Sequence, residues 1–395
     1  MKYIALIIDE LRKRVTEGLR VTREDSSIKP VELIDEASSK QIEVLDEPVV
    51  KQVEVKPAGV RGEIFALDSS SRVIETPYVF IGVGAGSVYS RLTGRSIDAP
   101  HASSILGLEE PLCKHMVVIP EVELEQDYLS NVKLIPGVLT CNPKGALYTS
   151  KYNKHIALVE LRLMIESCLM KLFQGSNYAA PGTVLMVDGP LIHPFHIPAE
   201  ASFTWSRDKV KSYSEALEYL NSERVSIVRD LLARKVLTIG IVKRLVKSYY
   251  LSSVDPAGLS VGRINDEAYV STLLLRLNTA IEKPLIIGPI RVKHETLSAS
   301  KLMWYIITPR RLCPLTSSMG NYVVYRVEVL ENSSINEDEV LGHVFYDSIY
   351  TGSLLPLSLL VVDKRVKKIT SSIVTYLLYM TGLTEESTSQ YISVL

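Results

Sequence analysis

Two short apolar runs, each ending in an aspartate, constrain the fold of this chain more than any other feature. The first is IFAL at 64–67, followed by Asp68 and three serines, and the second is VLMV at 184–187, followed by Asp188. Apolar runs of this length without polar alternation are typical of strands buried on both faces of a sheet. A carboxylate at the end of a buried strand is costly unless it is paired, hydrogen-bonded or bound to a metal. We therefore expect two strands to deliver Asp68 and Asp188 to one place.

The spacing of apolar residues gives the order of elements around these runs. A second strand is predicted at 78–85, and the mixed segment at about 89–153 is interpreted as an insertion. Apolar residues at helical spacing predict a helix at 155–173. The strand that ends in Asp188 follows this helix, so the core has the order strand, strand, insertion, helix, strand.

The N-terminal region differs from this core in its pattern. Residues 1–20 carry apolar positions at helical spacing, which predicts a helix. The polar and acidic residues 21–60 are interpreted as an irregular or only partly ordered lead-in, in which Val53 and Val55 indicate an edge strand. We divide the chain into this helix with its lead-in, one large domain and a C-terminal tail, at 1–60, 61–380 and 381–395.

Three alternate glycines of the second strand, Gly82, Gly84 and Gly86, raise the question of a phosphate-binding loop. The motif lacks the lysine and the serine or threonine of a Walker sequence, and no helical pattern follows it. Close approach of backbone, or a bend in the strand, explains these glycines better. The missing Walker motif also counts against a nucleotide-binding ATPase.

The second half of the chain alternates predicted helices and strands. A long amphipathic helix at 208–234 has its apolar stripe interrupted by Arg224, so one turn is expected to face solvent or a partner. A buried strand at 236–242 ends just before Lys243, which begins a basic cluster that either binds phosphate or belongs to a solvated helix start. Further apolar segments predict a helix at 268–280, strands at 284–292, 302–308 and 322–330, and a final helix at about 369–380.

Composition limits the partners and the compartment. The 395 residues have a formal net charge of −1, so any basic surface for nucleic acid must be local. The four cysteines form no CxxC pair, which argues against a structural zinc site. No secretory signal is present, and no apolar run approaches the roughly 18 residues needed to span a bilayer. These features predict a cytoplasmic protein with reduced thiols and no membrane contact.

Carboxylates from two neighbouring strands and a helix can hold divalent cations. Such cations prefer oxygen ligands, and two of them about 4 Å apart clamp the attacking and leaving oxygens of a phosphodiester. Each aspartate also has an ordinary structural explanation. Asp68 before three serines can form an Asx turn or cap a helix, and Asp188 before Gly189 and Pro190 can begin a turn. Taken singly, the ordinary explanation is better for each, but their shared context favours a joint metal site.

Other polar residues near the two aspartates are candidates for the same site. Glu160 and Glu166 lie off the apolar stripe of the predicted helix, although Glu166 can instead form a surface pair with Arg162 one turn away. His193 and His196 follow Asp188 and have a spacing that can bind a metal. Prolines at 194 and 198 indicate an irregular loop there, so we interpret both histidines as accessory.

Several of these stretches resemble the NurA nucleases of archaea and some bacteria. They are ALDSSSR at 66–72 with the glycine-rich second strand, the acidic helix, and VLMVDGPL at 184–191. IGIVK at 239–243 also resembles a strand that ends in lysine in this family. The resemblance is spread over residues 60 to about 380. It implies an α/β fold with an RNase H-like mixed sheet flanked by helices, an insertion after the second strand, and here an N-terminal helical extension.

The resemblance also implies a function and a site. The family consists of manganese-dependent deoxyribonucleases that degrade single-stranded DNA and resect duplex ends in double-strand-break repair, with Mg²⁺ as the alternative metal. Its members form dimers and work with the hexameric translocase HerA. By this resemblance Asp68 would be the first metal ligand and Asp188 the last. The helical glutamate falls on Glu166, with Glu160 as the other candidate, and Lys243 would orient or neutralise a phosphate.

The chain departs from the family pattern in two places. The first motif is Asp-Ser-Ser at 68–70, where the family usually has Asp-Gly-Ser. Family members also carry a tyrosine and a histidine before the last helix, where this chain has Ser353 and Val361. Losing the histidine removes a metal ligand or proton carrier, so the alternative function is a weakened subunit that binds and regulates the translocase. Polar residues that remain around these positions are Asp363, Arg365, Tyr350 and His343.

Overall fold

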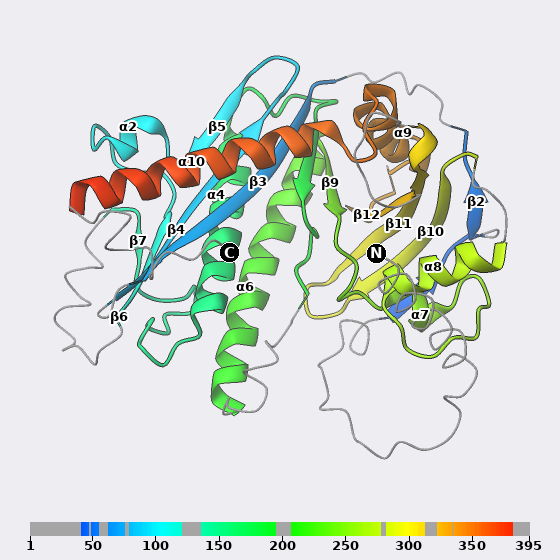
Figure 1. The fold of residues 1–395 in the computed structure, drawn as a ribbon, viewed down its shortest axis with the longest axis horizontal. Helices are drawn as coiled ribbons and strands as arrows, with labels where there is room; N and C mark the ends of the chain where they lie inside the picture. Colours follow the sequence, from blue (N-terminus) through cyan, green and yellow to red (C-terminus); the bar gives the residue numbers. More distant parts are fainter. Residues whose placement is uncertain are drawn as a thin grey trace, which may run out of the picture.

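The computed structural model describes residues 41–46, 49–54, 62–75, 79–120, 136–194, 207–277, 282–312, 322–333 and 335–381. In this part of the chain twelve strands form one mixed sheet with helices on both faces (Figure 1). The predicted α/β fold with a mixed sheet flanked by helices is therefore confirmed. The helix predicted at 1–20 and the C-terminal tail beyond residue 381 lie outside the described residues.

The two strands that carry Asp68 and Asp188 lie in the middle of the sheet. Strand β3 (Ile64–Glu75) and strand β8 (Val184–Asp188) are parallel neighbours. Strand β9 (Leu237–Val242) is parallel to β8 on its other side, and β4 (Val79–Tyr89) is antiparallel to β3. Across the sheet the strands follow the order β1, β10, β11, β12, β9, β8, β3, β4, β6 and β7.

An antiparallel half of the sheet follows β9. Its strands β10 (Leu285–His294), β11 (Ala299–Pro309) and β12 (Tyr322–Leu330) match the three late strands predicted from the sequence, and β12 pairs with β9. Strands β1 (Gln41–Val44) and β2 (Val50–Gln52) pair with the far side of β10. An edge strand of the lead-in is thus present, but at Val50–Gln52 and not around Val53, and Val55 lies outside the described residues.

The segment between β4 and the next long helix extends the sheet on the opposite edge. Strands β5 and β6 pair with β4, and β7 pairs with β6. A disulfide between Cys113 and Cys168, with Cα atoms 5.9 Å apart, ties this segment to that helix. The prediction of reduced thiols was therefore wrong for this pair, whose members lie 55 residues apart in sequence. The elements of the segment are β5 (Ser96–Ala99), α2 (Ala102–Ile105), β6 (Met116–Pro120) and β7 (Val138–Leu139).

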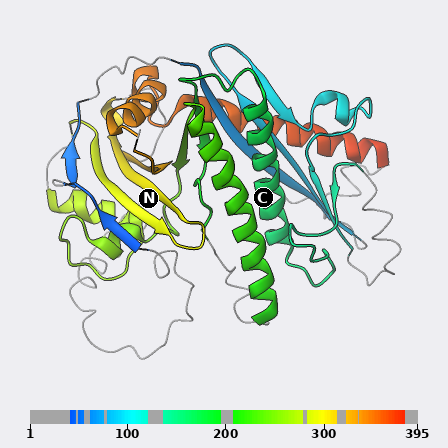
Figure 2. The ribbon, with the colours of Figure 1, turned by 180° about the vertical axis from the view of Figure 1, so that it is seen from behind.

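Three long helices cover the two faces of the sheet. Helices α4 (Lys154–Gly175) and α6 (Arg207–Ala233) lie on one face, and α10 (Leu357–Thr381) crosses the other (Figures 1 and 2). The Asn153 side chain accepts the Ile156 N–H at 3.0 Å and so caps the start of α4. No helix in the described ranges is both long and apolar enough to cross a membrane. Shorter elements are α7 (Tyr250–Val254), α8 (Asp266–Leu277), η1 (Arg310–Leu312), α9 (Glu337–Asp347) and η2 (Ile349–Thr351).

The apolar start of β3 is buried on both faces, as the sequence predicts. Phe65 and Leu67 belong to the core beneath α4, whereas Ile64 and Ala66 belong to the core beneath α10. Successive side chains of a strand point to opposite faces. By this alternation the side chain of Asp68 belongs to the α10 face.

The three glycines of β4 allow α4 to pack directly on the sheet. A Cβ atom at Gly82, Gly84 or Gly86 would lie 2.5 to 2.6 Å from a leucine or isoleucine side chain of α4. Close approach is thus confirmed as the reason for these glycines, and the space that a phosphate would need is filled by helix side chains.

Candidate active site

Asp68 and Asp188 lie side by side on one face of the sheet. In the parallel ladder Ala66 pairs with Met186, so the two aspartates occupy equivalent positions two residues further along β3 and β8. Ala66 and Met186 both lie in the core beneath α10. Because strand side chains alternate with a period of two, both carboxylates project toward α10 as well.

Asp68 is buried without a basic partner. Its side chain accepts the Ser69 N–H at 2.7 Å, and among the described residues no lysine, arginine or histidine forms an ion pair with it. Burial, followed by the carboxylates of Asp188 and Glu166, raises the pKa of Asp68 to about 8, while Arg162 and the Ser69 N–H act in the opposite direction. Without a cation, Asp68 therefore holds a proton at neutral pH.

Asp188 is partly compensated by Lys243. In the ladder of β8 and β9 Asp188 pairs with Ile241, and Lys243 lies two residues further on the same face. The Lys243 ammonium forms an ion pair with Asp188 Oδ2. The pKa of Asp188 is raised, because burial outweighs the opposing effect of Lys243 and because Glu166 and Asp363 add negative charge. Lys243 is followed by a loop and not by the helix start considered from the sequence.

Glu166 approaches this region from the other face of β3. Its Oε1 accepts a hydrogen bond from Ser69 Oγ at 2.5 Å, and its Oε2 accepts one from Arg224 Nη1 at 2.7 Å. Arg162 Nε donates to Ser69 Oγ at 3.2 Å. Burial acts to raise the pKa of Glu166, but Arg224 and the surrounding donors lower it below its ordinary value. The alternative of a surface pair with Arg162 was wrong, because Glu166 is buried and its partner comes from α6.

Arg224 is the residue of this region that sequence reasoning misplaced. It was expected to face solvent or a partner protein, yet it is 1% exposed. Its Nε and Nη2 atoms are buried without a hydrogen-bond partner. The signal was present in the sequence, since a cation that interrupts the apolar stripe of a buried helix needs an anion on the element packed against it.

Glu160 is separate from the acidic site. It accepts hydrogen bonds from Tyr148 Oη and Tyr152 Oη, both at 2.8 Å. Burial raises the pKa of Glu160 to about 7, although both tyrosine hydrogen bonds act to lower it. Of the two helical candidates, only Glu166 therefore contacts the residue that follows Asp68.

Helix α10 brings charged residues over the aspartates. Asp363 lies close enough to act on the Asp188 carboxyl, and it pairs with Lys367 at 2.8 Å. Arg365, by contrast, is paired with Asp98 at 2.6 Å. Asp363 is thus the acid that α10 contributes to this face.

The positions expected to carry the family's tyrosine and histidine are occupied by Ser353 and Val361. Ser353 is buried just before α10, and Val361 is half-buried within it. Of the two substitutes considered from the sequence, Tyr350 is 45% exposed in η2, and His343 is buried within α9 with its Nδ1 unpartnered.

His193 is held in the loop after β8. The Asn221 side chain binds both its backbone N–H, at 2.8 Å, and its carbonyl, at 2.9 Å. Burial and then the charge of Arg224 lower the pKa of His193 to about 3, so its imidazole is neutral. Its Nε2 is buried without a partner. His196 lies outside the described residues.

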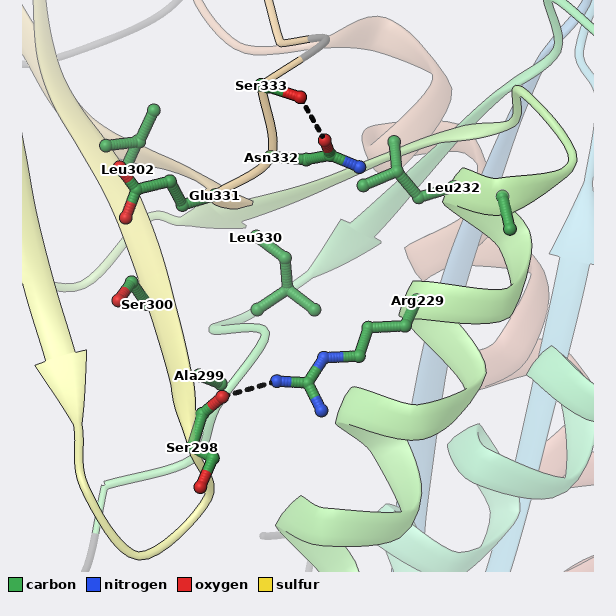
Figure 3. A pocket seen from close by; sticks show the side chains of 11 residues that line it. Arg229, Leu232, Ser298, Ala299, Ser300, Leu302, Leu330, Glu331, Asn332 and Ser333 are labelled. Atoms are coloured by element: carbon green, nitrogen blue, oxygen red, sulfur yellow. Dashed lines mark hydrogen bonds between the residues drawn. The ribbon is translucent and has the colours of Figure 1, made fainter.

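A pocket of about 760 Å³ lies elsewhere, between α6 and the strands β11 and β12. Arg229 extends from α6 toward the turn before β11 and donates to the Ser298 carbonyl at 2.6 Å, and Leu330 lies beside this hydrogen bond (Figure 3). Neither Asp68 nor Asp188 lines this pocket. The acidic site is therefore a position on the sheet face and does not coincide with this cavity.

The fit of a divalent cation differs among the three acids. Asp68 and Asp188 fit a shared cation, since they are adjacent on one face and Asp68 has no basic partner. Glu166 fits less well, because both of its oxygens are engaged by Ser69 and Arg224. Consistently, no group of three histidine, cysteine, aspartate or glutamate side chains is arranged to hold a metal within the described ranges.

The chain is similar to known proteins both in sequence pattern and in fold. It is similar to the crystal structure of the NurA nuclease from Sulfolobus solfataricus, with 12% identity, 96% of this chain and 98% of that chain covered, and a TM-score of 0.44. It is also similar to a crystal structure of NurA with manganese, with 10% identity, 94% and 97% coverage and a TM-score of 0.42. No curated protein sequence matches it. The model of the NurA domain matches residues 62–368, which is most of the chain, so this protein belongs to the NurA domain family.

Proposed function

We propose that this protein is a metal-dependent deoxyribonuclease. Asp68 and Asp188 form the site at which it hydrolyses phosphodiester bonds of DNA. The observation that carries the proposal is the placement of these two acids at equivalent positions on parallel neighbouring strands, on one face. One of them, Asp68, is buried without a basic partner among the described residues. A site of this kind favours a divalent cation, and family membership together with the resemblance to NurA nucleases supports DNA as the substrate.

Each residue has a definite part in this proposal. Asp68 and Asp188 would hold the cation, with Mn²⁺ as the expected metal and Mg²⁺ as the alternative. A bound cation would supply Lewis-acid activation of the attacking water and of the phosphate oxygens. Lys243 is 25% exposed and reaches Asp188, so its ammonium can exchange from the carboxylate to a phosphate oxygen. Direct binding of the metal by Glu166 remains a prediction from the family resemblance.

The cellular role follows from the resemblance. We propose that the protein acts on single strands and duplex ends during double-strand-break repair, as a cytoplasmic homodimer working with a HerA-type hexameric translocase. The alternative is a catalytically weakened subunit that binds and regulates the translocase. Ser353 and Val361 favour this alternative, because they stand where the family pattern has a tyrosine and a histidine.

A cleavage assay separates the two functions. The full chain is incubated with end-labelled single-stranded DNA and Mn²⁺, alone and with its translocase, beside Asp68→Asn and Asp188→Asn. Asp230→Asn is the matched control, since Asp230 is an exposed aspartate on α6. We expect cleavage by the unmodified protein and the control and none by the two site variants. Cleavage no faster than that of the site variants would leave only the regulatory function.

A further inference from the structure

We propose that Asn221 of α6 and Gly240 of β9 are positioning residues for Asp188, because they hold the loop that follows it. This inference rests on the proposed function, since it concerns the same site. The loop, residues 189–193, packs on the face of the sheet opposite to the two strand aspartates, so both residues act through the backbone and not on the substrate.

The loop changes face directly after Asp188. The Asp188 carboxylate projects toward α10, whereas Leu191 and Ile192 are buried in the core beneath α4. The change takes place at Gly189, whose φ of 130° is a conformation that residues with a side chain rarely adopt. The Gly189 N–H also donates to the Ile241 carbonyl at 2.9 Å. Since Asp188 lies immediately before this turn, the seating of the loop sets the orientation of Asp188.

The loop crosses β9 at a residue without a side chain. A Cβ atom at Gly240 would lie 2.9 Å from the Gly189 carbonyl oxygen and 3.0 Å from Leu191 Cγ. Gly240 pairs with Val187 of β8 on one side and with Glu328 of β12 on the other. The loop therefore lies directly on the sheet between β8 and β12, and only glycine at position 240 leaves it the space to do so.

Glu328 receives the loop beyond β9. Its Oε2 accepts the Leu191 N–H at 3.1 Å, and its Oε1 accepts from Lys301 Nζ at 2.9 Å and Arg326 Nε at 2.8 Å. Burial acts to raise the pKa of Glu328, but Lys301 and Arg326 lower it to about 2, so the carboxylate stays charged. A buried carboxylate bound to two cations is a fixed acceptor for the loop.

Asn221 fixes the far end of the loop. Its Oδ1 accepts the His193 N–H at 2.8 Å, and its Nδ2 donates to the His193 carbonyl at 2.9 Å. Asn221 is 7% exposed, so water does not readily replace these bonds. With Gly189 bound to β9 and Leu191 bound to β12, three alternate residues of the loop are held. This is the arrangement expected where a metal ligand must keep one orientation.

Asparagine variants test the loop anchor by removing it. Asn221→Leu loses both bonds to His193. Asn142→Leu is the matched control, because Asn142 is 2% exposed and its Oδ1 also accepts two backbone N–H groups of a loop, those of Lys144 and Ala146. Urea unfolding verifies that both variants fold and compares their loss of stability.

Glycine variants test the seating of the loop without removing a polar group. Gly240→Ala must displace the loop, because its Cβ would meet Gly189 and Leu191. Gly262→Ala is the matched control, since a Cβ there would meet open space among the described residues. If Asn221→Leu fails to fold, the glycine pair decides the question.

Two quantities are measured on the full chain. They are the Mn²⁺ affinity, from the electron paramagnetic resonance signal of free Mn²⁺, and kcat and KM for cleavage of labelled single-stranded DNA. We expect Asn221→Leu and Gly240→Ala to weaken Mn²⁺ binding by about tenfold or more, the scale typical of groups that orient metal ligands. At a fixed Mn²⁺ concentration kcat should fall and KM for DNA should stay the same, because the loop lies on the opposite face of the sheet. Both controls should keep the affinity of the unmodified protein.

The possible failures are distinguishable. Unchanged Mn²⁺ affinity in folded Asn221→Leu or Gly240→Ala overturns the inference and leaves the proposed nuclease intact. An equal loss of affinity in Asn142→Leu also overturns it, because general destabilisation would then explain the effect. Absence of both Mn²⁺ binding and cleavage in the unmodified protein overturns the proposed function itself.

Discussion

Replacing Asp68 by asparagine should make the metal-free protein more stable in alkali. In the folded chain the pKa of Asp68 is about 8, against an ordinary value of 3.8, first because of burial and then because of Asp188 and Glu166. Between these two values the unfolded chain has already lost the proton that the folded chain still binds. Stability must therefore fall as pH rises from about 4 to about 8 and then level off.

The size of this effect follows from the shift. One pKa unit corresponds to about 1.4 kcal/mol, so this single carboxyl lowers the free energy of unfolding by about 4 kcal/mol between pH 5 and pH 9. Asparagine does not titrate, and its side-chain oxygen can still accept the Ser69 N–H that Asp68 accepts at 2.7 Å. Between pH 5 and pH 9 the free energy of unfolding of the variant should therefore rise by about 4 kcal/mol relative to that of the unmodified protein.

Urea unfolding at pH 5, 7 and 9 in the presence of a chelator measures the difference. The chelator keeps trace cations from stabilising Asp68, and taking the difference between two proteins cancels titrating groups that they share. Asp230→Asn is the control and should follow the unmodified protein, because Asp230 is exposed. If the curves of Asp68→Asn and the unmodified protein run parallel from pH 5 to pH 9, the electrostatic description of the site is refuted.

Four further variants test other contacts. Lys243→Met should raise the pKa of Asp188 further, because it removes the paired ammonium, so Mn²⁺ binding should require a higher pH than in the unmodified protein; Mn²⁺ titrations across pH check this. Arg224→Met should lower the free energy of unfolding by about 3–5 kcal/mol, because it leaves Glu166 buried and unpaired. Adding Glu166→Gln should recover most of that loss in the same denaturant assay. Replacing Cys113 and Cys168 by serine should lower the free energy of unfolding by about 4 kcal/mol, since the disulfide closes a loop of 55 residues. Equal unfolding midpoints for the oxidised protein and the variant would contradict this.

The meeting of Asp68 and Asp188 could be predicted because it depends on few physical facts. Two apolar runs without alternation indicate buried strands, and in parallel neighbours Asp68 and Asp188 take equivalent positions on one face. The expectation that Asp68 ends its strand was wrong, because β3 continues past it to Glu75. The close packing of α4 on Gly82, Gly84 and Gly86 was predictable for a similar reason, since the alternative motif lacked its essential lysine.

The face on which each acid lies could not be obtained in the same way. A helix carries its residues around its whole circumference, so the position of Glu166 off the apolar stripe does not tell which side of a strand it reaches. Arg224 shows the same limit, because its burial depends on a partner 58 residues away that no local pattern identifies. The disulfide and the pairing of β1 and β2 with β10 also join segments that are distant in sequence.

Asp68 differs from the other buried acids of the described chain in how its charge is compensated. Each of the others accepts a hydrogen bond from at least one hydroxyl or basic side chain, as shown by Glu160 with Tyr148, Glu328 with Lys301 and Asp347 with Arg91. Asp68 has only a backbone N–H. A buried carboxylate without a cation destabilises the fold, and on the proposed function a divalent cation shared with Asp188 would remove that cost. The loss of stability in alkali and the affinity for a cation are therefore two measurements of one property, and a variant at position 68 must change both together. The buried acids compared in this way are Asp68, Glu160, Glu166, Asp266, Glu328 and Asp347.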